Sequence, residues 1–375
     1  WIEAGKDADG VYRLEALDAK LREAPPASLA CSILENLDLS GLDLSAVTSL
    51  NKARVTAVNF SNAVFGAVDM KRVQLSEVTL VGIGLSGADL SNLALPEIDL
   101  SNADLSAANM SNMNLAMAIL RGADLSQATL TGATFTDVDF GGGNLAGIIA
   151  NGARFSGARM PDVPMRSAVL TQANLGQAVM TGVDLNAANL SQAQLVGANL
   201  TGAALSRANL TNAIAQGTNF SGAVMVEATL RGTDFSGGRL VDVAFHRATL
   251  DGTNFTRANL TGTIGHPTTF TNVDLSSANL CGSAWSLRNA ALVESEATLT
   301  IDTVCPKKEA DGRCVATAGD HPQLSCGLFP ECELATHAGC ANNQLCCDAG
   351  GVAACQGTGP GIADQCTACG AACNL

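Results

Sequence analysis

Residues 183–202 read VDLNAANLSQAQLVGANLTG, and every fifth residue of this stretch is leucine. The residue two positions before each leucine is valine or alanine. An α-helix repeats one face near every 3.6 residues and a β-strand every two, so neither explains a period of five. A chain that turns a corner once in each pentapeptide does explain it, with one small and one large side chain pointing inward.

The same register continues without a break from Leu50 to Trp285, which makes 48 consecutive pentapeptides. Leu, Phe or Met occupies 43 of the large positions, and Ala or Val occupies 34 of the small ones. If each pentapeptide forms one side of a square, four sides close a coil, and coils stack at the β spacing of about 4.8 Å. We therefore expect an all-β solenoid of about 12 or more coils, which would form a stiff rod.

Several runs share the motif Ala-(Asp/Asn)-Leu-X-X, among them residues 103–106, 123–126, 198–202 and 258–262. In this motif the chain resembles the pentapeptide-repeat family, and the resemblance covers about residues 32–300. It implies the right-handed quadrilateral β-helix of that family.

Residues twenty apart should lie on one another in neighbouring coils of a square solenoid. This places Phe135 against Phe155 and Phe235 against Phe255 as stacked rings in the core. A few large positions hold small residues and should be underfilled weak points. They are Ala150, Ala215 and Gly265.

The sequence divides into three segments: a cap at 1–30, the solenoid at 31–304 and a cysteine-rich module at 305–375. Leucines at helical spacing in residues 12–24 predict a short amphipathic helix that covers the first coil. Such a cap is expected because an open coil end is an unpaired β edge.

Eleven of the 13 cysteines lie after residue 304, a density typical of disulfides formed in an oxidising compartment. Zinc binding by Cys366-x-x-Cys369 and its neighbours is the less favoured alternative. Since eleven is odd, one cysteine must pair outside the module, and Cys281 is favoured over Cys31. Cys31 is then expected to be buried as a small apolar side chain, or else to link to a neighbouring molecule. The disulfide candidates are Cys281, Cys305, Cys314, Cys326, Cys332, Cys340, Cys346, Cys347, Cys355, Cys366, Cys369 and Cys373.

The charged segment that begins at Trp1 is typical of a mature chain whose signal peptide has been removed. Together with the cysteines, it predicts an extracellular or cell-surface protein. The sequence holds no stretch of about 20 apolar residues, so no transmembrane segment is expected. A formal net charge of −14 argues against direct binding of nucleic acid.

Motifs for catalysis are not found: the chain has no phosphate-binding glycine loop, nucleophile elbow or zinc-protease helix. It has only 4 histidines, none of them with a recognisable catalytic partner. His246 and His266 should lie one above the other, but two neutral surface ligands make a poor metal site. We therefore expect no enzyme activity, and no catalytic, cofactor-binding or metal-binding residues.

Three functions are compatible with these features. The favoured one is an exported structural scaffold that presents flat faces and assembles or attaches to a protein partner through its ends, as a filament or a surface appendage. The second, implied by the family resemblance, is a DNA mimic that binds DNA gyrase. The third is an ice- or glycan-binding face, suggested by a short ladder of Thr229, Thr249 and Thr269.

Overall fold

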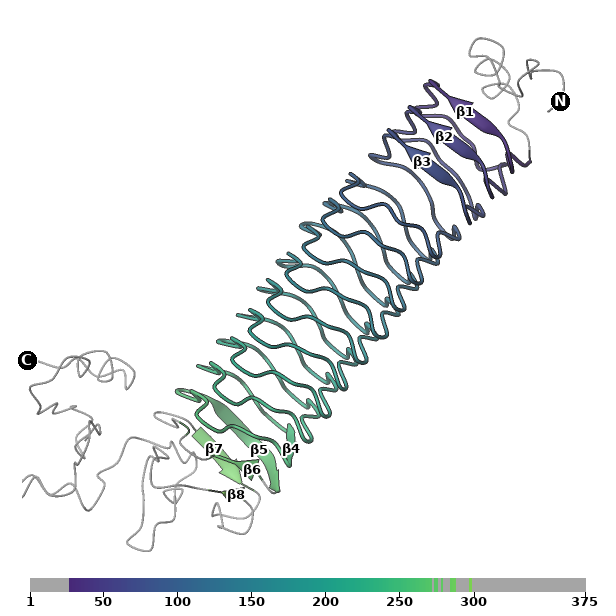
Figure 1. Cartoon of the computed structure of the whole chain (residues 1–375). Helices are drawn as coiled ribbons and strands as arrows, with labels where there is room; N and C mark the ends of the chain where they lie inside the picture. Colours follow the sequence, from purple (N-terminus) through teal and green to yellow (C-terminus); the bar gives the residue numbers. More distant parts are fainter. Residues whose placement is uncertain (1–26, 272, 276–277, 279–283, 288–296, 299–375) are drawn as a thin grey trace, which may run out of the picture. The chain divides into compact units, whose positions relative to one another are not determined.

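The computed structural model describes residues 27–271, 273–275, 278, 284–287 and 297–298 (Figure 1). They fall into two compact units, of which unit 1 ends at Gln194 and unit 2 begins at Leu195. Each unit is a stack of coils in which most neighbouring chain segments pair in parallel with residues twenty positions further on. This spacing is the one expected from four pentapeptides per coil.

The strands of unit 1 are β1 (Ile33–Glu35), β2 (Arg54–Thr56) and β3 (Gln74–Ser76), which form a parallel sheet in that order. Strands β1 and β2 pair at a separation of 21 residues, whereas β2 and β3 pair at 20. The extra residue lies between Leu44 and Leu50, which are six positions apart instead of five.

In unit 2, β4 (Thr249–Asp251) pairs with β5 (Ile264–Thr271), and β5 pairs with β7 (Ala284–Leu287). A second parallel pair joins β6 (Val273–Asp274) to β8 (Ala297–Thr298). The pairing of β5 with β7 shifts register between Gly265 and Thr268. No helix occurs in the described parts of either unit.

One pentapeptide shows how each corner forms. The Ala103 N–H donates to the Leu100 carbonyl at 3.1 Å, and Asn102 between them has a φ of +58°. A hydrogen bond across four residues with positive φ at the third is the signature of a type II turn. Asparagine tolerates this conformation, and glycine adopts it freely, which explains why the motif so often holds one of them here.

The side chains at the large and small positions point inward, as predicted from the period of five. Ala123 and Leu125 are both fully buried, as are nearly all equivalent residues. Unit 2 differs in having buried threonines in place of some alanines: Thr218, Thr233, Thr253 and Thr263. Each buried hydroxyl donates to a backbone carbonyl; that of Thr218, for example, lies 2.6 Å from the Leu195 oxygen. At these four positions the core of unit 2 therefore contains hydroxyl groups, and each of them has a hydrogen-bond acceptor.

The predicted weak points Ala150 and Ala215 are fully buried. Each is followed five residues later by a buried phenylalanine, Phe155 or Phe220. The larger ring on the next side of the same coil offsets part of the missing volume.

The expected burial of Cys31 is wrong. Cys31 is an exposed, free cysteine with a φ of +58°, because it is the second residue after buried Leu29 and so occupies a corner. The predicted cap helix at 12–24, Cys281 and the cysteines from Cys305 to Cys373 lie outside the described residues.

Candidate functional site

Where the outward residue just before a large residue is Asp or Asn, its side chain takes part in local turn formation. In the repeat around Leu200, the Asn199 side-chain oxygen accepts the Thr201 N–H at 3.2 Å and the Thr201 hydroxyl at 2.6 Å. The Ser191 N–H donates to Asn189 in the same way, at 3.1 Å. Asp or Asn in the motif therefore stabilises the corner. Its side-chain oxygen already accepts hydrogen bonds from the chain itself, which leaves less of its hydrogen-bonding capacity for a ligand.

Ion pairs in unit 1 join one coil to the next on the outer surface. The Lys71 ammonium lies 2.6 Å from the Asp89 carboxylate, and the Arg121 guanidinium lies 2.7 Å from Asp139. Arg166 pairs with Asp184 in the same arrangement. Because the basic side chains are about half exposed or more, each pair contributes only about 0.2–1 kcal/mol.

Asp139 combines burial with strong hydrogen bonding. Burial raises its pKa, but the Gly141 N–H at 3.0 Å and the Arg121 guanidinium outweigh this effect and hold the pKa below its ordinary value of 3.8. A carboxyl whose pKa is lower in the folded state stabilises the fold above the unfolded pKa and loses that contribution as the pH falls through the folded pKa.

We therefore expect the melting temperature of the chain to fall as the pH is lowered from about 5 to about 2, mostly below the ordinary carboxyl value. Arg121→Gln should make this fall smaller, because it removes one cause of the low pKa of Asp139. Circular dichroism melts at several pH values measure both effects. An identical pH dependence in the two proteins would contradict the role of Arg121.

Unit 2 carries an apolar column on one outer side, formed by Ala204, Val224, Ala244 and Ile264. Parallel backbone bridges join each of these residues to the next. Val224 is 39% exposed and Ile264 is 41% exposed, so both aliphatic side chains are in contact with water. Val226, which is partly exposed, lies on the same side two residues after Val224.

A charged ladder follows the edge of this column. The Glu227 carboxylate accepts hydrogen bonds from Arg207 at 2.7 Å and from Arg247 at 3.2 Å. These two bonds hold the pKa of Glu227 below its ordinary value. The side is therefore apolar along its centre and charged along one corner.

The residues singled out from the sequence lie in different parts of the two units. In unit 1 the rings of Phe135 and Phe155 are stacked, with centroids 5.1 Å apart and planes 8° apart. In unit 2 the corresponding values for Phe235 and Phe255 are 5.3 Å and 7°. These four rings are buried, so they belong to the core and not to a binding surface.

The threonine ladder pairs Thr229 with Thr249, and Thr249 with Thr269, through the backbone. His246 is partly exposed, and the side chain of His266 lies outside the described residues. The described residues contain no group of three His, Cys, Asp or Glu arranged to hold a metal ion. They also contain no helix long and apolar enough to span a membrane.

The family model for pentapeptide repeats matches in 8 copies, over residues 83–116, 114–145, 165–202, 203–240 and 239–264. The chain carries pentapeptide repeats. Repeats of this family imply a right-handed β-helix, in agreement with the parallel pairing of both units. Pentapeptide-repeat proteins are generally structural or interaction proteins.

Three solved structures of pentapeptide-repeat and related proteins are similar to the chain. HetL, involved in heterocyst differentiation regulation in the cyanobacterium Nostoc, is 28% identical over 53% of this chain and 81% of its own, with a TM-score of 0.24. A protein from the Arabidopsis thaliana thylakoid lumen is 30% identical over 29% of this chain and 66% of its own, with a TM-score of 0.17. QnrB1, a plasmid-mediated fluoroquinolone resistance protein, is 22% identical over 46% of this chain and 84% of its own, with a TM-score of 0.27.

No curated protein matches the chain. The pentapeptide repeats therefore supply the fold, and a function for this chain must be argued from its own surface.

Proposed function

We propose that this chain is an exported, non-catalytic scaffold that binds protein, including further copies of itself, through the outward sides of its pentapeptide repeats. The apolar column of unit 2 carries the proposal. Exposed aliphatic side chains aligned on a flat β surface lose unfavourable contact with water when a second surface covers them.

The arrangement around the column supports a protein partner. Protein interfaces typically combine an apolar centre with a polar or charged rim. Here Val224, Val226 and Ile264 provide the centre, and the ladder of Arg207, Glu227 and Arg247 provides one rim. The proposal also includes assembly through the solenoid ends and attachment by the cysteine-rich segment. These parts of the proposal concern residues outside those that the structure describes.

The proposal of export rests on the cysteines after residue 304. In the proposed extracellular or cell-surface location, the twelve candidate cysteines would be oxidised.

The gyrase-binding alternative depends on imitation of duplex DNA, and charge density argues against it. Residues 27–194 contain 14 acidic and 8 basic residues, a net charge of −6. Their roughly eight coils extend about 40 Å, a length over which duplex DNA carries about 24 negative charges. Residues 195–275 contain 5 acidic and 5 basic residues. The scaffold is therefore the better supported function.

The ice- or glycan-binding alternative has support from only a short stretch. The column of Thr229, Thr249 and Thr269 continues from Asn209, and the charged residues Arg231 and Asp251 follow its threonines on the same side. A regular array of hydroxyls is thus limited to a few coils, which favours the apolar column as the functional surface.

Self-association of the full chain tests the proposal. We expect light scattering to show oligomers that increase with concentration, and Val224→Asp combined with Ile264→Asp to weaken the association by about tenfold or more. In the same native preparation, mass spectrometry without reductant should find the twelve candidate cysteines oxidised.

The matched control is Asn219→Asp combined with Asn259→Asp, which adds the same two charges to a neighbouring side at equivalent repeat positions. It should leave association nearly unchanged. A chain that stays monomeric at every concentration would contradict self-assembly, free thiols with bound zinc would contradict export, and inhibition of gyrase supercoiling would support the alternative.

A further inference from the structure

The hydrogen-bonded ladder of unit 1 is interrupted between two neighbouring coils. It is intact at the bond from the Met70 N–H to the Asp89 carbonyl (3.0 Å) and again at the bond from the Gly82 N–H to the Ser101 carbonyl (2.7 Å). Between these two points, no backbone hydrogen bond or bridge of the described residues joins one coil to the next. The interruption covers two of the four sides of the coil.

One coil further on, the equivalent bonds all form, at 2.8 to 2.9 Å, from the N–H groups of Leu95, Glu97 and Leu100. The amides in the interruption that lack this bond are those of Arg72, Leu75, Glu77 and Leu80 on one edge and of Ala94 and Asp99 on the other. Both edges thus present unpaired N–H and C=O groups, which is the condition for pairing with an added strand.

The interruption coincides with large residues at the small inward position on both of its sides. The small inward position, which is usually alanine, holds Val73 and Val78 in one coil and Leu93 and Ile98 in the next. Larger residues are stacked on both of the interrupted sides, so the two coils cannot approach closely without steric overlap. In the following coil Ala118 stacks on Ile98 and Met113 stacks on Leu93, and the ladder forms again on both sides. Large residues on one side alone therefore do not open it.

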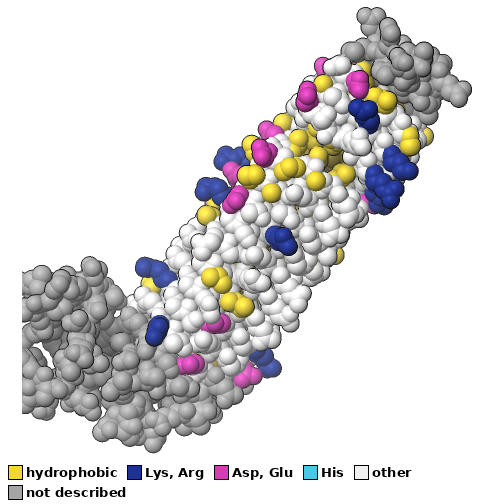
Figure 2. Space-filling model, viewed as in Figure 1, with side chains coloured by type: hydrophobic (Ala, Val, Ile, Leu, Met, Phe, Trp, Pro, Cys, Tyr) yellow, Lys and Arg dark blue, Asp and Glu magenta, His cyan; other side chains and the backbone are white. Residues whose placement is uncertain are grey.

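The interruption exposes the interior of the solenoid. Leu75, Val78, Leu95 and Ile98 are the only inward residues between Leu50 and Leu260 in the described chain that are not buried. Figure 2 shows exposed hydrophobic side chains as a band across this part of unit 1.

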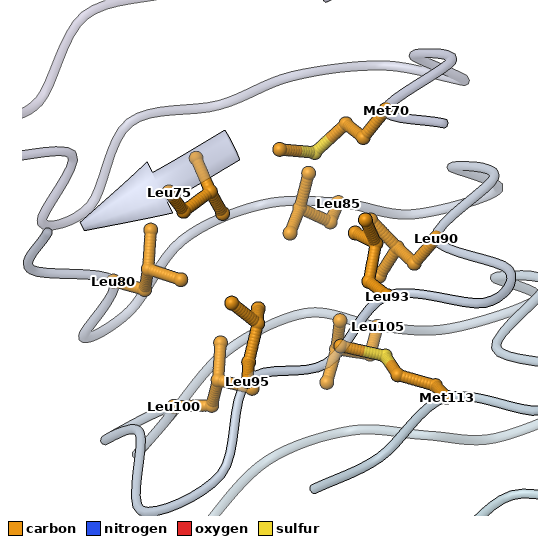
Figure 3. Close-up of a pocket in the computed structure, with 10 residues that line it drawn as sticks. All are labelled: Met70, Leu75, Leu80, Leu85, Leu90, Leu93, Leu95, Leu100, Leu105 and Met113. Atoms are coloured by element: carbon orange, nitrogen blue, oxygen red, sulfur yellow. The ribbon is translucent and has the colours of Figure 1, made fainter. Parts of the chain in front are cut away.

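Beneath these residues lies an apolar cavity of about 10 Å³, whose lining side chains point toward one another from both coils (Figure 3). We call the two edges, residues 72–81 and 91–100, together with this cavity, the slot.

Negative charge marks the corner of the slot. Glu77 and Glu97 are exposed at equivalent corner positions of the two edges, and Asp99 follows on the second edge. In the described chain neither glutamate has an ion-pair or hydrogen-bond partner for its carboxylate. Two carboxylates at equivalent positions of facing edges favour a cation placed between them.

We propose that the slot binds a peptide segment of a partner protein that is extended along each of the two sides and bends at the corner between them. Its backbone pairs with both edges, its alternate apolar side chains cover the exposed leucines, and a Lys or Arg lies between Glu77 and Glu97. A strand that pairs on both sides separates the two edges by about twice the usual 4.8 Å. A linear acyl chain would cover the same leucines but would leave the edge amides unpaired, so the peptide is the favoured occupant.

Hydrogen exchange of the full chain tests this inference directly. Before ligand is added, the amides of Leu75, Glu77 and Leu80 should exchange faster than those of Leu95, Glu97 and Leu100 by about tenfold or more. A short synthetic peptide of alternating Val and Thr with Lys at its centre should then slow exchange on both edges. Equal protection of the two sets in the free chain would overturn the proposal, because the ladder would then be closed.

Two peptide controls separate strand pairing from apolar binding. The same peptide methylated on its backbone nitrogens cannot donate to the edges and should bind at least tenfold more weakly. Equal binding of the methylated peptide, or binding of dodecanoate without binding of the unmodified peptide, would overturn strand pairing in favour of an apolar ligand.

Two variants test the residues. Glu77→Lys combined with Glu97→Lys changes only exposed side chains, and should weaken binding of the Lys-containing peptide by about tenfold or more. Val78→Ala combined with Ile98→Ala removes the large residues from one of the two interrupted sides, and should restore slow exchange of the Leu80 and Asp99 amides on that side and weaken binding. Unchanged binding in the glutamate variant would contradict the proposed position of the peptide's lysine. The inference does not depend on the apolar column of unit 2, so its failure leaves the proposed function standing.

Discussion

Leu130→Lys is expected to unfold unit 1, at a cost of about 4 kcal/mol or more. Leu130 is fully buried, and its side of the coil is closed above and below by backbone bonds. The lysine ammonium would therefore be taken out of water with no acceptor or opposite charge to compensate. Because each coil is stabilised by its neighbours, loss of one coil removes contacts from the two adjacent ones as well.

Thr131→Lys is the matched control, since it adds the same side chain to the next residue. Thr131 is exposed at a corner, and its replacement should change stability by less than about 0.5 kcal/mol. Chemical denaturation of both variants, followed by circular dichroism, measures the difference. A similar loss of stability in both would mean that the inward and outward positions of the repeat are wrongly assigned.

The repeat could be predicted in detail because every coil has the same requirement, namely that its inward side chains be apolar. An inward position such as Leu130 must be apolar and an outward one such as Thr131 need not be, so the period of five specifies which residues are buried. The same period gives the twenty-residue spacing that places Phe135 on Phe155.

Local departures from the repeat could not be read from its period. Cys31 was expected in the core as a small apolar side chain, yet it is the second residue after buried Leu29 and so lies at an exposed corner of the first coil. The slot has a visible signal, because Leu93 and Ile98 occupy positions that are usually alanine. Whether such residues fit or force two coils apart depends on the volumes stacked on them, and this appears only when neighbouring coils are compared.

The apolar column is a similar case. Ala204, Val224, Ala244 and Ile264 are twenty residues apart, so the sequence does align them. Composition alone does not separate them from inward alanines and valines, because the repeat places an apolar residue at many positions. The exposure of Val224 and Ile264 identifies them as surface residues and not core residues. They are exposed because each stands immediately before a large inward residue and therefore points outward.

Phe155→Ala is expected to destabilise unit 1 by about 3–5 kcal/mol. Phe155 is fully buried; its ring stacks on Phe135 at 5.1 Å and lies 6.1 Å from that of Phe140. The cost should lie toward the upper end of this range, because the preceding large position of the same coil is occupied by Ala150. Two consecutive small residues would leave a cavity that the surrounding chain, held by its ladder bonds, cannot collapse to fill.

Phe155→Leu keeps an apolar side chain of intermediate volume and should cost less than about 1.5 kcal/mol, apart from the lost ring stacking. Combined with Phe135→Leu, it forms a double-mutant cycle, in which we expect a coupling of about 0.5–1.5 kcal/mol between the two rings. Denaturant melts of the four proteins give this value. Additive effects would show that the rings stabilise the coil through volume alone, and equal stability of Phe155→Ala and Phe155→Leu would show that the coils collapse around the missing ring instead of preserving a cavity.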